Sequence, residues 1–317
     1  MIGTDYRQMV KEARGLPALA SVVTRVMMAV IEETSAREIA QLIEKDASIT
    51  ARVLKVINSA YYGLSGHVST VSQAVPLLGI QVVKNIVLTF SVMDIFAHEN
   101  AKGVDFKKLW EHAFTTAVAS RILAERVGYP DREEALVAGL LHDIGILLFV
   151  KNDLTTYAEA VKVHKETGRA LADVEEELMG ITHAELGALL AEKWHLPEVI
   201  VLPIRHHHSP GLMEGGGQVR KLTQAVYEAD RLCDLFLVPQ EQEAIVAYQN
   251  ELYRSLGIKE RDLLLVMTEI TREVEETSKT FMVEVESPRS YVELLEQAHL
   301  ELGRMNLSYL MTQDANR

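Results

Sequence analysis

The stretch Ala138-Gly-Leu-Leu-His142-Asp143-Ile144-Gly145 sets a histidine beside an aspartate at the end of an apolar segment. The residues before it predict a buried helix, because they are apolar almost all round and follow a capping-box-like pair, Asp131 and Glu134. Gly145 is predicted to end this helix in the left-handed conformation. An unpaired buried carboxylate costs on the order of several kcal/mol. The histidine and the aspartate therefore need partners, either a divalent metal ion or, as a hydrogen-bonded pair in the core, each other.

The composition is that of an ordinary globular protein. The 317 residues are 48% hydrophobic and 24% charged, which is typical of packed domains. The single cysteine, Cys233, excludes a disulfide framework and a cysteine-rich zinc site, and it fits a reducing compartment. The N-terminus has no apolar signal core, and no apolar run approaches the roughly 20 residues that span a bilayer. We therefore expect a cytoplasmic protein with no membrane partner.

The charge balance argues against a nucleic-acid partner. The formal net charge is −13, and the basic residues are scattered among more numerous acids. Proteins that bind DNA or RNA usually present a basic face. An acidic surface also repels phosphorylated ligands unless bound metal ions reverse the local field.

Helical periodicity and capping signals recur along nearly the whole chain, which predicts an all-α fold. Five short helices joined by tight loops are expected within an N-terminal helical subdomain, residues 14–100. A long helix over 106–127 then opens a second helical subdomain, residues 101–235, which contains the His-Asp pair. Residues 236–317 are predicted to form a C-terminal helical extension. Its last apolar face can pack on the body, pair two chains into a homodimer, or have led to an output domain in relatives, and all three alternatives stay open.

Side chains of metal-ligating types recur at predicted helix ends and inward faces. They are His112, His142, Asp143, His183, His207, His208 and Asp230. Imidazole and carboxylate ligands suit one or two divalent transition-metal ions, among which we favour iron over manganese, zinc or nickel. An aspartate flanked by several histidines can bridge two ions about 3.5–4 Å apart, which is the role expected of Asp143.

The candidates outside the His-Asp pair also have plainer interpretations. His112 lies on the long helix among small residues that leave room beside its ring, but a lone helical histidine is more often packed or exposed. Thr182 and Glu185 predict a capping box that places His183 on a first helical turn. That position indicates the mouth of a site rather than its core, and the ring could equally face solvent.

Other polar segments are predicted to be solvated. Two of the three histidines in the run 206–208 could reach a site, although such a run also suits a solvated helix end. Asp230 could be an ordinary surface charge beside Arg231, and the acidic segment 173–177 is interpreted as a solvated helix face. The remaining histidines are expected to be surface or core residues: His67, His98, His164, His195 and His299.

The order of these motifs resembles the HD phosphohydrolase superfamily, and the details resemble its HDOD branch, the HD-related output domain of bacterial signalling proteins. The resemblance runs from about residue 14 to 235. Its motifs are Leu16-Pro17-Ala18-Leu19, Ile43-Glu-Lys-Asp46-Ala-Ser-Ile49, Asn58-Ser59-Ala60-Tyr61-Tyr62-Gly63 and Ala74-Val-Pro-Leu-Leu78-Gly79.

The resemblance implies an all-α signalling module, many relatives of which have lost the metal ligands. Here His112, His142, Asp143 and Asp230 match the core HD pattern. His183 and the His207-His208 pair match extra ligand positions of the related HD-GYP cyclic-di-GMP phosphodiesterases.

Two departures bear on catalysis. Active HD-GYP relatives carry a lysine after His-Asp-Ile-Gly, where this chain has Ile146, and the Gly-Tyr-Pro signature is absent. We therefore expect a metal-binding signalling module without efficient catalysis, which acts by binding a protein partner or by sensing a ligand or the metal state. The alternative is a metal-dependent phosphohydrolase acting on a nucleotide or cyclic dinucleotide, with Arg205 or Lys221 replacing the missing cation. A third hypothesis is a scaffold whose polar core is merely hydrogen-bonded.

Overall fold

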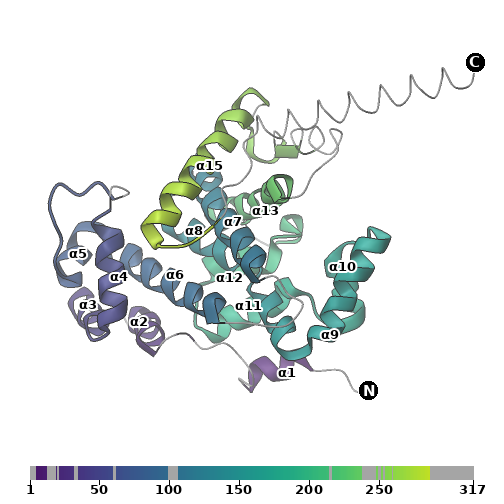
Figure 1. Ribbon diagram of the computed structural model, residues 1–317, viewed down its shortest axis with the longest axis horizontal. Helices are drawn as coiled ribbons and strands as arrows, with labels where there is room; N and C mark the ends of the chain where they lie inside the picture. The colour runs from purple at the N-terminus through teal and green to yellow at the C-terminus, as the bar shows by residue number, and fades with distance from the viewer. Residues whose placement is uncertain are drawn as a thin grey trace, which may run out of the picture.

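The computed structural model describes residues 5–12, 19, 21–31, 35–59, 62–98, 106–213, 216–237, 248, 251–252, 254–258 and 260–285. Every regular element in these ranges is a helix (Figure 1), which confirms the predicted all-α class. No helix in them is long and apolar enough to cross a membrane. The predicted subdomain boundaries stay a prediction.

The helices form two groups along the chain. The first comprises α1 (Tyr6–Lys11), α2 (Ser21–Ile31), α3 (Ala36–Glu44), α4 (Ala47–Ile57), α5 (Val71–Leu78) and α6 (Ile80–His98). The second comprises α7 (Phe106–Arg126), α8 (Arg132–Leu141), α9 (Ile144–Thr167), α10 (Leu171–Met179), α11 (His183–Lys193), α12 (Glu198–His206), the 3-10 turn η1 (Pro210–Leu212) and α13 (Gln218–Leu237). A further helix, α15 (Glu260–Phe281), lies along α7.

Local capping signals begin several of these helices as the sequence predicts. Ser35 and Glu38 form a complete capping box at the start of α3, and the Asp46 side chain accepts from the Ile49 N–H at the start of α4. Asp131 accepts from the backbone N–H groups of the first turn of α8 at 2.9 and 3.0 Å. Each cap satisfies backbone donors that a helix start leaves without an intrahelical partner.

Gly145 does not end a helix, and that prediction was wrong. Helix α8 ends at Leu141, α9 begins at Ile144, and Gly145 lies inside α9 without a positive φ. A Cβ at this position would stand 2.0 Å from the carbonyl oxygen of His183 and 2.8 Å from the backbone nitrogen of Gly187. The glycine is needed because the backbones of α9 and α11 touch there. His142 and Asp143 form the corner between α8 and α9, as the last cap of one helix and the first cap of the other.

A second glycine brings α7 and α8 together. A Cβ on Gly139 would lie 2.5 Å from the Ser120 hydroxyl oxygen and 2.8 Å from the Cα of Ala117. The packing of α7 against α8 and that of α7 against α13 are the most extensive in the described part of the chain. Close approach of α7, α8 and α13 places three of the candidate ligand positions near one another.

Helix α15 is fastened to α7 by a buried ion pair. The Arg121 side chain is 0% exposed and donates to Glu273 Oε2 at 2.8 Å and to the Thr277 hydroxyl at 3.2 Å. Helix α15 also packs on α4, and Phe281 at its end lies against Phe90 of α6 with ring centroids 5.4 Å apart. This helix therefore ties the first group of helices to the second. The final apolar stretch expected to pack or dimerise lies outside the described residues.

We predict that Glu273→Gln destabilises the fold by roughly 3 kcal/mol, because it removes the charge that compensates a buried guanidinium. The matched control is Glu269→Gln, whose pairing with Arg126 is more than one-third exposed on both sides and should contribute under about 1 kcal/mol. Urea denaturation followed by circular dichroism measures both. Equal losses in the two variants would contradict the role given to the buried pair.

Candidate metal centre

The fold brings all seven predicted ligand residues together from separate helices. They form two groups, within each of which one ligand atom per residue lies within 4.8 Å of the others. The first cluster is His112, His142 and Asp230; the second cluster is Asp143, His183, His207 and His208. Helices α7 and α13 supply His112 and Asp230, and the corner between α8 and α9 supplies His142 and Asp143. His183 begins α11, and the last two histidines follow α12.

The first cluster has the spacing of ligands around a single ion. His112 Nε2 lies 3.1 Å from Asp230 Oδ1 and 3.2 Å from His142 Nε2. His142 Nε2 lies 3.4 Å from Asp230 Oδ1 and 3.3 Å from Asp143 Oδ2. Ligands that hold one ion with bonds of about 2.1 Å are themselves about 3.0–3.4 Å apart. These four side chains therefore fit a metal ion without rearrangement.

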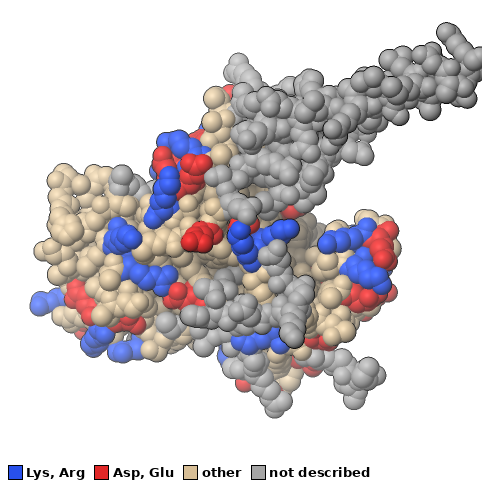
Figure 2. Space-filling model, in the orientation of Figure 1, with Lys and Arg blue, Asp and Glu red and all other residues tan. Residues whose placement is uncertain are grey.

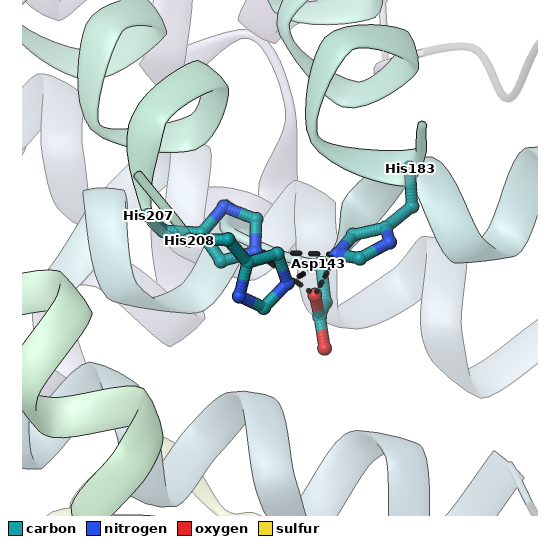
Figure 3. A group of neighbouring side chains, drawn as sticks. All are labelled: Asp143, His183, His207 and His208. Carbon is teal, nitrogen blue, oxygen red and sulfur yellow. Dashed lines mark hydrogen bonds and ion pairs between the residues drawn. The ribbon is translucent and has the colours of Figure 1, made fainter. Parts of the chain in front are cut away.

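The second cluster faces the other oxygen of Asp143. Asp143 Oδ1 lies 3.3 Å from His183 Nε2 and 3.5 Å from His207 Nε2, and His183 Nε2 lies 2.8 Å from His208 Nε2. Figure 3 shows the three rings gathered about one oxygen of Asp143, while its other oxygen points away from them. A carboxylate placed in this way can bridge two ions.

Hydrogen bonds fix three of the imidazoles with Nε2 toward the centre. The Nδ1 of His142 donates to the carbonyl of Gly139, and the Nδ1 of His207 donates to the carbonyl of Ile204, both at 2.7 Å. Because a carbonyl oxygen only accepts, Nδ1 carries the proton and the neutral ring presents the Nε2 lone pair inward. Where the rings are neutral, lone pairs facing one another at these distances repel unless a proton or a metal ion lies between them. The donor set, imidazole with carboxylate, suits a divalent transition metal.

Glu175 holds the third ring and was missed in the sequence. Its Oε2 accepts from His183 Nδ1 at 2.6 Å and from the His183 backbone N–H at 2.8 Å, and its side chain is fully buried. The prediction that segment 173–177 is solvated is wrong at this residue, although Asp173 and Glu177 are exposed. Glu175 follows Leu171 by four residues and precedes Met179 by four, so it shares the buried face of α10. That spacing was the available signal.

The burial of the ligands settles several alternatives. His183 begins α11 as predicted, but it is only 1% exposed, so the prediction that it lies at the mouth of the site was wrong. The hydrogen bond to the buried Glu175 holds its ring inside the protein. His112 and Asp230 point inward with side chains 15% and 8% exposed, so neither is a surface residue. Of the run 206–208, the last two histidines face the centre. His208 is the most exposed ligand, at 40% of its side chain.

Charges in the centre stabilise one another. Burial opposes ionisation of Asp143, but the imidazoles around it, His142 first, hold the pKa of its carboxyl well below the usual range. Burial also disfavours a charged His142, yet Asp143 and Asp230 hold the pKa of that imidazole well above its usual range. In the metal-free protein a proton on His142 therefore supplies the positive charge that the carboxylates require.

Metal uptake at pH 7 should release at least one proton, because a cation can bind His142 only after Nε2 loses its proton. Since the pKa of His142 is raised in the metal-free state, the apparent affinity should rise with pH, by about tenfold per pH unit for each proton released. Calorimetric titration in two buffers of different ionisation enthalpy measures the proton count. A binding heat that is the same in both buffers would contradict this prediction; His67→Gln, on the surface, is the control.

The variant Glu175→Gln should lower metal affinity by about 10–100-fold, because the amide can still orient His183 but no longer supplies charge behind it. The matched control is Glu176→Gln, one residue along α10 on its exposed face. Competition with a chromophoric chelator gives both affinities, and a thermal melt shows that the fold is kept. Equal metal affinities in the two variants would show that Glu175 does not support metal binding.

The family of this chain follows from comparison with known proteins. Residues 16–210 match the HDOD domain. A 200-residue stretch is 26% identical to an uncharacterized protein of Treponema pallidum (strain Nichols), and it covers 61% of this chain but 38% of that protein. The chain thus spans well under half the length of this relative.

Two crystal structures share the fold. One is a candidate phosphohydrolase from Shewanella amazonensis SB2B, 26% identical with a TM-score of 0.66; the alignment covers 88% of this chain and 99% of that one. The other is an HDOD domain protein of unknown function from Geobacter sulfurreducens, 24% identical with a TM-score of 0.67 and the same coverage. Because the matched residues make up more than half of the chain, this protein belongs to the HDOD domain family.

Proposed function

We propose that this HDOD protein is a metal-binding signalling module that acts by binding other proteins, without efficient phosphoester hydrolysis. The observation that carries the proposal is the convergence of seven ligand side chains on two facing clusters that share Asp143. The expected cations are divalent transition-metal ions, one or two per chain, with iron favoured over manganese, zinc and nickel.

The two cationic side chains expected to hold a substrate phosphate, Arg205 and Lys221, do not support that role. Position 146, next to the His-Asp corner, is a buried isoleucine. Arg205 is bound to Glu185 and Glu192, each at 2.8 Å. Lys221 is exposed and lies nine residues before Asp230 on α13, a rise of about 13 Å along the helix. Neither basic residue expected to replace the missing lysine supports that role.

The carboxylates of the centre also disfavour a phosphate ligand. Asp143, Asp230 and Glu175 are buried together around the histidines. A single divalent ion would leave this group negative, and two would leave it only weakly positive. Without a fixed arginine or lysine, a phosphate group would depend on the ions alone.

Surface charge supports a protein partner over a nucleic acid. Figure 2 shows Lys and Arg side chains scattered among Asp and Glu over the described part of the face in view. With a net charge of −13, such a surface lacks the electrostatic attraction on which nucleic-acid binding depends. A second copy of the chain is included among the protein partners we propose.

A metal-dependent phosphohydrolase is the second candidate, acting on nucleotides or cyclic dinucleotides. It is favoured by the two-sided contacts of Asp143 and by the 40% exposure of the His208 side chain, which gives solvent a way to the second cluster. Two divalent ions bound here would polarise phosphoryl oxygens and lower the pKa of water. The first cluster would hold one ion, the second cluster the other, and Asp143 both.

Metal quantification and a phosphoester panel on the same sample test the proposal. We expect about one to two equivalents of a divalent transition metal and no turnover of phosphomonoesters, phosphodiesters, nucleotides or cyclic dinucleotides. Asp143→Ala should lose the metal, and His67→Ala should keep it. Turnover by the parent protein that Asp143→Ala abolishes would establish the second candidate instead. A protein that neither contains nor takes up metal would be a scaffold with a hydrogen-bonded polar core.

A further inference from the structure

The two clusters differ in charge, burial and support, and we infer that they bind metal ions in a fixed order. The first cluster fills first and retains its ion, whereas the second cluster is the exchangeable position, opened and closed by His208. This inference rests on the proposed metal binding and concerns how the chain's own residues regulate it.

Charge separates the clusters first. The first cluster combines two imidazoles with Asp230 and with Asp143 Oδ2. The second cluster combines three imidazoles with the remaining oxygen of Asp143. A divalent ion would therefore be in direct contact with two carboxylates, Asp230 and Asp143, in the first cluster, and with one, the shared Asp143, in the second, where Glu175 lies behind His183. Coulomb attraction in a buried site is strongest for direct contacts and favours the first cluster.

The bridging carboxylate makes the two binding events interfere. An ion in the first cluster places two positive charges about 3.5–4 Å from the second position. It also draws on the same carboxylate that the second ion needs. The second ion is then bound mainly by neutral imidazoles, so its affinity is lower and its exchange faster.

His208 is the ligand that can move. His142, His183 and His207 each donate Nδ1–H to a fixed acceptor at 2.6–2.7 Å. The Nδ1 of His208 lies 3.7 Å from Asp230 Oδ2, which is too long for a hydrogen bond. Its side chain is 40% exposed, and it sits between the end of α12 and η1 rather than within a helix. Rotation of this ring opens the second cluster without displacing a helix.

Cobalt(II) titration of the metal-free full chain tests the order, followed by calorimetry and by visible absorption. We expect two steps, the second weaker by about tenfold or more. His208→Ala should leave the first step and weaken the second by a further tenfold or more. His206→Ala, the half-exposed neighbour outside both clusters, is the matched control and should change neither step.

Asp230→Asn completes the test by weakening the first step, and His112→Ala replaces it should the asparagine variant fail to fold. Two ions bound with equal affinity would overturn the inference, as would a His208→Ala variant that weakens both steps alike or neither. Uptake of a single ion would overturn the order while leaving the proposed metal binding intact. Uptake of none by the parent chain would overturn both.

Discussion

Two buried aspartates surrounded by imidazoles are the constraint on which the rest of this structure depends. Moving a carboxylate out of water is costly unless positive charge and hydrogen-bond donors meet it. Asp143 cannot find them on its own helix, since it occupies a corner between α8 and α9. Its partners are His142, beside it in the corner, and imidazoles from α7, α11 and the end of α12, so three further parts of the bundle converge on one side chain.

Local signals were enough to predict most of the fold. Caps such as Ser35, Asp46 and Asp131 act within one helical turn, so the sequence around them specifies each helix start without tertiary information. Gly145 shows where that approach fails. Glycine serves a left-handed turn and a close backbone contact equally well, and only the position of α11, forty residues further along the chain, decides between them.

The ligand residues could be proposed from residue type and helical context, but their grouping could not. That Asp143 divides its oxygens between two clusters depends on how five elements meet. Glu175 was missed for a related reason, because the composition of residues 173–177, four acids in five residues, is typical of a solvated helix face. Its period-four spacing with Leu171 and Met179 carried the information, and the acids outside that spacing, Asp173, Glu176 and Glu177, are exposed.

Helix α15 lies beyond the residues that match the family, yet it packs on α7, the helix that carries His112, and pairs with the buried Arg121 of that helix. Arg121 stands nine residues after that histidine, about two and a half turns further along α7 and therefore on the opposite side of the helix. A fragment that ends at residue 210 would expose to water the side of α7 that α15 covers. It would also remove Glu273, the carboxylate that pairs with the buried guanidinium of Arg121. The folding unit of this protein therefore extends beyond residue 210, where the family match ends, and includes α15.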